Sequence, residues 1–187
     1  IRQIFIVGSF LIEKVDYNDI DLVIITNKKQ EDLEKKIYNY FIKKFPLKIH
    51  IIIIPEDSFL YLLRICPLTR SMFYYYISNK KFDLPLNTTI NKNHIKFLLM
   101  MPEDLLKIAA NSRSFYDNIR RLITIKQFLE NKDLNPVEIN VKLKFLFGEF
   151  LYSQIKNNEP IDKEILKYLR GIIKTNLEEI QKSIINK

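Results

Sequence analysis

The chain has little cysteine and little glycine, and each shortage limits what this protein can be. Cys66 is the one cysteine among 187 residues, which excludes a disulfide within the chain. A lone thiol is typical of a reducing compartment, so we expect a cytoplasmic protein. Only three glycines are present, whereas Ile, Lys, Asn, Phe and Tyr are abundant. This composition predicts long helices and few tight turns.

Long apolar runs are also missing. No run approaches the roughly 20 residues that a membrane-spanning helix needs, and the run at residues 49–54, which His50 interrupts, has the length of a strand. No signal peptide, internal repeat or low-complexity segment is present, and we expect no membrane partner. The chain opens with Ile1 directly before the first predicted strand, so we expect that some N-terminal residues are missing.

What is present is a hydrophobic content of 47% and a net charge of +8. The length suits one domain or two small ones, and enough apolar residues are available for a core. The positive charge has two interpretations. A basic surface attracts nucleic acid or nucleotide phosphates, but lysine pairs such as Lys28-Lys29 lie among acids and are typical of an ordinary solvated surface.

One stretch near the start carries most of the functional signal. An apolar run at residues 4–7 stops at Gly8-Ser9, and a second run opens with Asp19 and Asp21 on either side of one isoleucine. Side chains alternate along a strand, so we expect both carboxylates on one face. They would repel each other without a cation between them, and Mg²⁺ favours such oxygen ligands. A Gly-Ser turn allows the backbone to approach a phosphate group.

This pattern resembles the signature of the DNA polymerase beta-like nucleotidyltransferase superfamily, over roughly residues 1–55. The resemblance implies that Gly8 and Ser9 hold the triphosphate. It also implies that Asp19 and Asp21 bind Mg²⁺ (or Mn²⁺) as catalytic metal ligands. In that family a third carboxylate on a later strand completes the site and helps to activate the attacking hydroxyl.

The third position departs from the family pattern. The predicted strand at residues 47–54 contains no acid, and its register places His50 where an aspartate would stand. Lys48 shares that face. Three interpretations remain open: His50 itself ligates the metal or accepts a proton, Glu56 or Asp57 reaches in from beyond the strand, or the site is weakened. A plain structural role for a hydrogen-bonded histidine is a further alternative.

The remaining patterns predict the architecture of the first half as a small mixed α/β core. We expect strands at residues 3–7, 19–26 and 47–54, and helices at residues 28–44 and 56–65. Pro67 is expected to end the helix at residues 56–65, and the aromatic run within residues 68–79 suits either a core or base stacking. The polar stretch at residues 81–93 predicts a domain boundary.

The second half predicts helices at residues 102–131, 136–156 and 159–184, which would form an antiparallel bundle. The fold class is therefore α+β, with a nucleotidyltransferase-like α/β domain at residues 1–93 and a helical bundle domain at residues 94–187.

His94 is expected at the surface. The only histidines are His50 and His94, and neither lies in the predicted bundle helices, so we expect that the bundle is not an active histidine-dependent ribonuclease module of the kind found beside some relatives. Basic side chains on the first long helix suit either ligand contacts or solvated surface: Arg113, Arg120, Arg121 and Lys126.

Two functions follow as hypotheses. The first is a nucleotidyltransferase in which an acceptor hydroxyl attacks the α-phosphorus of a nucleoside triphosphate, with Asp19, Asp21 and His50 as catalytic residues. RNA, a protein side chain and a small molecule all remain open as acceptors, and the oligomeric state is open too. The second is a catalytically weakened nucleotide- or RNA-binding module within a larger assembly, which the missing third acid favours.

Overall fold

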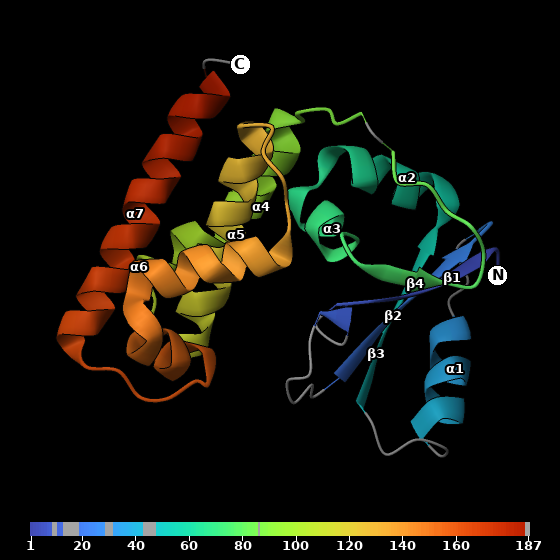
Figure 1. The fold of residues 1–187 in the computed structure, drawn as a ribbon, viewed down its shortest axis with the longest axis horizontal. Helices are drawn as coiled ribbons and strands as arrows, with labels where there is room; N and C mark the ends of the chain where they lie inside the picture. The colour runs from blue at the N-terminus through green and yellow to red at the C-terminus, as the bar shows by residue number, and fades with distance from the viewer. Residues whose placement is uncertain (9–10, 13–18, 29–31, 43–47, 86, 186–187) are drawn as a thin grey trace. The chain divides into compact units, whose positions relative to one another are not determined.

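The computed structural model describes the chain except for residues 9–10, 13–18, 29–31, 43–47, 86 and 186–187. The described residues form a mixed α+β structure with one four-stranded sheet and seven helices. They divide into two compact units (Figure 1). The sheet unit comprises residues 1–65 and 72–89, and the helical unit comprises residues 66–71 and 90–187.

The sheet has the strand order β3-β2-β1-β4. Its strands are β1 (Gln3–Val7), β2 (Asp19–Thr26), β3 (Lys48–Pro55) and β4 (Tyr76–Ser78). β1 runs antiparallel to both β2 and β4, whereas β2 and β3 are parallel. The parallel pair is joined through helix α1 (Leu33–Ile42), since parallel neighbours need a crossover connection. The three strands expected from the sequence are confirmed to within one residue, but β4 was not predicted.

Apolar side chains cover both faces of the sheet, with α1 on one face and α2 (Glu56–Ile65) on the other (Figure 1). On the α2 face, strand residues pack against Phe59 and Leu63. On the α1 face, strand residues pack against Ile37 and Phe41. The two sets of strand residues alternate along each strand: Phe5, Val7, Val23 and Ile25 on the α2 face, and Leu22, Ile24 and Ile51 on the α1 face.

The aromatic run contributes to the core on the α2 face. Phe73 is fully buried, with its ring centroid 5.1 Å from that of Phe5 and 4.9 Å from that of Phe59. Tyr76 is half-buried, and its hydroxyl donates a 2.6 Å hydrogen bond to the Phe82 carbonyl. The core interpretation of this run is therefore confirmed for Phe73, which has no exposed ring face on which a base could stack.

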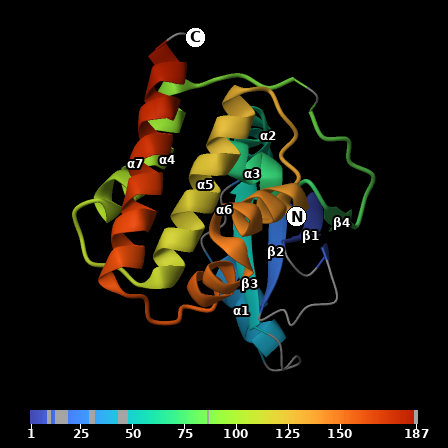
Figure 2. The same cartoon turned by 60° about the vertical axis from the view of Figure 1, so that its left-hand side comes forward.

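The helical unit is built around α5, which packs against α4, α6 and α7 (Figure 2). Its long helices are α4 (Lys92–Leu105), α5 (Ser112–Leu129), α6 (Pro136–Lys156) and α7 (Lys163–Ile185). The short helix α3 (Pro67–Met72) begins at Pro67, which was expected only to end the preceding helix. Proline fits the first position of a helix, where its missing N–H group costs no hydrogen bond. None of the described helices is both long and apolar enough to cross a membrane.

The single helix predicted over residues 102–131 is wrong, because the structure has two helices there. Asn91 caps α4 by accepting a hydrogen bond from the His94 amide, so this helix begins ten residues before Pro102, which lies in its last turn. Asn111 accepts from the Ser114 amide and starts α5 anew. His94 is consequently a half-buried residue in the first turn of α4 rather than a surface residue.

The helix predicted over residues 136–156 is confirmed in extent, but it is not continuous. Gly148 has φ 73° and ψ 159°, which are not helical values, and α6 bends there (Figure 1). Glycine adopts a positive φ without the steric cost that a Cβ atom brings. Asn135 caps α6 and Pro136 occupies its first position, as the sequence pattern predicted.

Candidate functional site

Strand pairing brings two predicted site residues, Asp21 and His50, to one end of the sheet. Val7 pairs with Asp21 on β2, and Asp21 pairs with His50 on β3. Paired residues on neighbouring strands project to the same face, and Val7 belongs to the core on the α2 face. Asp21 and His50 therefore lie on that face, one row beyond the strand positions at which Val23 and Ile52 pack against the core.

Gly8 follows Val7 and approaches Asp21 more closely than any other residue type could. Its φ is +92°, and a Cβ added there would lie only 2.3 Å from the Asp21 Oδ2 atom. The sequence predicted that this glycine allows close approach to a phosphate. The structure adds a different reason for glycine, because the backbone turn lies directly against the Asp21 carboxylate.

Asp21 and His50 are in direct contact. The Nδ1 atom of His50 lies 3.2 Å from Oδ1 of Asp21. A carboxylate can only accept a hydrogen bond, so Nδ1 carries the proton and, in the neutral imidazole, Nε2 presents its lone pair. The side chain of His50 is 65% exposed and that of Asp21 is 27% exposed. The pair thus offers a solvent-facing base or ligand atom next to an anchored carboxylate.

The other two predicted site residues are only partly described. The backbone of Asp19 belongs to β2 and pairs with Lys48, two positions before the Asp21–His50 pair. The side chain of Asp19 and the whole of Ser9 lie outside the described residues. Lys48 is exposed, and the alternation of β3 places it on the same face as His50. The sequence showed that shared face but not the pairing of Lys48 with Asp19.

The donor set allows a test of whether a divalent cation fits. Among the described residues no three His, Cys, Asp or Glu side chains form a metal-binding group. Asp21 supplies the carboxylate oxygens that Mg²⁺ and Mn²⁺ prefer, whereas an imidazole such as that of His50 is more typical of transition-metal ions. The described residues therefore supply part of a site, which a carboxylate at residue 19 would extend.

The acids beyond β3 cannot take the third position. Glu56 begins α2 at the opposite end of the strand, six residues after His50, or about 20 Å along an extended chain. Its Oε2 atom is 2.9 Å from Nη1 of Arg2. Asp57 follows it in the same helical turn. The interpretation in which Glu56 or Asp57 reaches into the site is therefore wrong.

The basic side chains predicted on the first long helix all lie on α5, but their surroundings differ. Arg113 pairs with Asp117 at 3.2 Å, and Lys126 pairs with Glu179. Arg121 is half-buried, and this burial lowers the pKa of its guanidinium from the ordinary value, although Asp117 opposes the shift. Arg120 makes no ion pair or hydrogen bond with its side chain in the described part of the chain.

Comparisons with protein-family models, with curated proteins and with solved structures find no match to this chain. The interpretation of the site therefore depends on its residues and their geometry.

Proposed function

We propose that this protein is a nucleotidyltransferase that transfers a nucleoside monophosphate from a nucleoside triphosphate to an acceptor hydroxyl. The observation that carries the proposal is the convergence of Gly8, Asp21 and His50 at one end of the sheet. A glycine turn, a carboxylate and an imidazole base are groups that such a transfer can use. The antiparallel β1–β2 pair followed by the parallel strand β3 supports a nucleotidyltransferase-like core.

Each residue has a distinct part in this proposal. Asp21, with Asp19, holds the divalent cation, and Gly8 and Ser9 form the turn that binds the outer phosphates. A bound Mg²⁺ or Mn²⁺ supplies positive charge that offsets the charge developing on the phosphates. His50 donates from Nδ1 to Asp21, which orients its Nε2 atom to accept the proton of the attacking hydroxyl.

A second candidate is a nucleotide- or RNA-binding module with a weakened site. Two observations favour it. His50 contacts Asp21 directly and takes the place of a carboxylate. Lys48 is the strand partner of Asp19 and shares the face of His50, and a positive charge on that face disfavours a metal cation. In this alternative the triphosphate binds at the Gly8 turn but is not turned over.

The experiment that tests the proposal measures pyrophosphate release from each nucleoside triphosphate, with Mg²⁺ or Mn²⁺ and with total cellular RNA as an acceptor. We expect metal-dependent release that Asp21→Asn lowers by at least about a hundredfold, since even outer-shell partners of a metal ligand contribute ten- to a hundredfold. Asp83→Asn makes the same acid-to-amide change at an exposed position of the sheet unit and should have no effect.

The outcomes separate the two candidates. Turnover that survives in Asp21→Asn would contradict the mechanism. Triphosphate binding without turnover in the natural chain would favour the weakened module, and His50→Asp would then be expected to restore activity by supplying the third carboxylate.

A further inference from the structure

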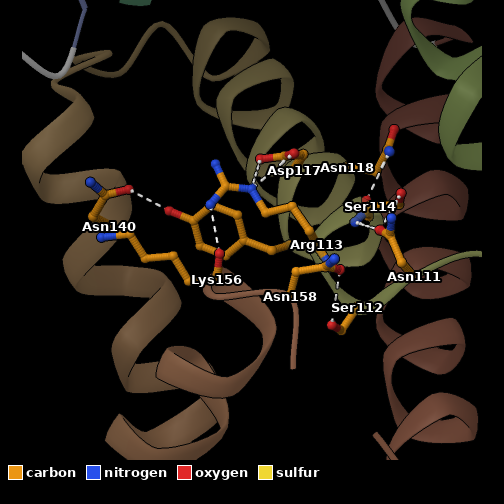
Figure 3. Close-up of polar contacts among 10 residues, drawn as sticks. Asn111, Ser112, Arg113, Ser114, Asp117, Asn118, Asn140, Lys156 and Asn158 are labelled. Atoms are coloured by element: carbon orange, nitrogen blue, oxygen red, sulfur yellow. Dashed lines mark hydrogen bonds and ion pairs between the residues drawn. The ribbon is translucent and has the colours of Figure 1, made fainter. Parts of the chain in front are cut away.

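A pair of buried tyrosines lies between α5 and α6 in the helical unit. Tyr116 is 3% exposed and Tyr152 is 5% exposed, and their rings meet edge to face with centroids 5.7 Å apart. The Tyr116 hydroxyl lies 3.4 Å from Oδ1 of Asn140 on α6 (Figure 3). The two rings thus form an apolar and hydrogen-bonded centre that solvent hardly reaches.

Four cationic side chains surround this tyrosine pair. The Arg113 guanidinium carbon lies 4.9 Å from the centre of the Tyr116 ring. The Nζ atoms of Lys144 and Lys156 lie 5.5 and 5.7 Å from the centre of the Tyr152 ring. Arg120 follows Tyr116 by one helical turn, on the same side of α5. We call Arg113, Arg120, Lys144 and Lys156 the α5–α6 basic cluster.

Acidic partners neutralise only half of the α5–α6 basic cluster. Arg113 pairs with Asp117 and also donates a 2.7 Å hydrogen bond to the Lys156 carbonyl (Figure 3). Lys144 lies 3.3 Å from Glu149. No carboxylate of the described residues pairs with Arg120 or with the Lys156 ammonium group. α5 as a whole has four basic residues and one acidic residue.

Arg120 is the more unusual of the two unpaired cations. It is half-buried, and its Nε atom is buried without a hydrogen-bond partner among the described residues. Withdrawing a charge or a polar donor from water without a partner is unfavourable. An anion bound at the exposed part of this side chain would offset the unpaired charge. The pKa of Tyr116 is raised to about 12, chiefly by burial and then by the neighbouring Tyr152 side chain, so its hydroxyl adds no competing negative charge.

We propose that Arg120 and Lys156 bind phosphate groups of a nucleotide or of a polynucleotide backbone. Arg120 lies one helical turn from Tyr116 and the Lys156 ammonium lies over the Tyr152 ring, and guanidinium and ammonium groups are the usual protein partners of phosphate. Because the tyrosine rings are buried, bases cannot stack on them, so recognition is through phosphates and independent of base identity. This binding does not require the proposed transferase activity.

The test measures fluorescence anisotropy of two labelled probes with the full chain in EDTA, which removes any contribution of a divalent cation. The probes are a short single-stranded oligouridylate and a nucleoside triphosphate. We expect Arg120→Gln/Lys156→Gln to weaken binding by about tenfold or more, which is about 1.4 kcal/mol or more, because two charge-assisted contacts to phosphate are lost. Lys174→Gln, which removes an exposed charge from α7, is the matched control and should bind like the natural chain.

The two probes distinguish the source of the phosphate. Loss of oligouridylate binding in the double variant identifies a polynucleotide site, and the slope of log affinity against log salt should then fall by about 1.4, or roughly 0.7 for each lost contact. Loss of triphosphate binding alone identifies a nucleotide site. The proposal is overturned if neither probe binds, or if the double variant and Lys174→Gln bind equally.

A single variant keeps the result interpretable if the double variant does not fold. Lys156→Gln alone then replaces it, since the Lys156 ammonium makes no hydrogen bond to the described residues, and it should still bind both probes more weakly than Lys174→Gln. The assay contains EDTA and measures binding rather than turnover, so failure of the proposed transferase function would leave the phosphate result unchanged.

Discussion

Gly8 shows how one residue type can be required by a single contact. Its φ is +92°, and the 2.3 Å that would separate an added Cβ atom from Asp21 Oδ2 leaves no room for a side chain. We expect Gly8→Ala to lower the free energy of unfolding of the sheet unit by about 1–3 kcal/mol, the usual cost of a strained backbone position. Urea unfolding of Gly8→Ala and of the natural chain measures this difference in the free energy of unfolding.

Gly171 is the control for that substitution, because a Cβ there would meet nothing within 4 Å and the residue is helical. Gly171→Ala should stabilise the protein by about 0.5–1 kcal/mol, since alanine favours a helix interior. Equal effects of the two alanine substitutions would contradict the close approach of Gly8 to Asp21.

The stability of the protein should depend on pH through the protonation of His94. Burial lowers the pKa of His94 below its ordinary value of 6.5, and its Nε2 atom is buried without a partner among the described residues. The neutral ring is therefore favoured in the native state, so its contribution to stability is present above pH 6.5 and is lost as the pH falls through the lowered native pKa. As the pH falls through this range, the melting temperature of His94→Gln should decrease less than that of the natural chain. Parallel curves of melting temperature against pH would contradict the prediction.

Among the elements, α5 depends on its cap. The Asn111 side chain accepts hydrogen bonds from the Ser114 amide and the Ser114 hydroxyl, at 2.9 and 2.8 Å. We expect Asn111→Ala to cost about 1 kcal/mol of stability, the typical value for an N-cap. Asn93→Ala is the control, because Asn93 is exposed in the first turn of α4 and its side chain makes no hydrogen bond to the described residues. An equal loss in both variants would argue against the cap.

The helices and strands differ in how well the local sequence predicts them. β1 and β2 were predicted at their observed bounds because short apolar runs with sharp ends define them locally. β4 has only three residues, and its strand character depends on pairing with β1, some seventy residues earlier in the chain. The break between α4 and α5 was missed because apolar spacing continues across it, although the cap residue Asn111 is a local signal that could have revealed it.

At the scale of the whole molecule, ligand binding should increase thermal stability. A ligand that binds only the native state raises the melting temperature, by about 5 °C or more at a hundredfold excess over its Kd. We expect a nucleoside triphosphate with Mg²⁺ or Mn²⁺ to produce such a shift, and EDTA or Asp21→Asn to reduce it, whereas Asp83→Asn should not. A shift that is the same in Asp21→Asn and Asp83→Asn would place the triphosphate elsewhere than the Gly8 turn.

The sequence by itself determined the α+β class, the bounds of β1, β2 and α2, and the placement of residues 19 and 21 on one face of a strand, because these follow from local periodicity and turn chemistry. It also placed His50 in the expected register. Only the tertiary structure decided that His50 contacts Asp21, that Gly8 lies against the same carboxylate, and that Arg120 lies half-buried without an acidic partner among the described residues. Those contacts join residues from different elements, and which elements meet depends on how the whole chain buries its apolar surface.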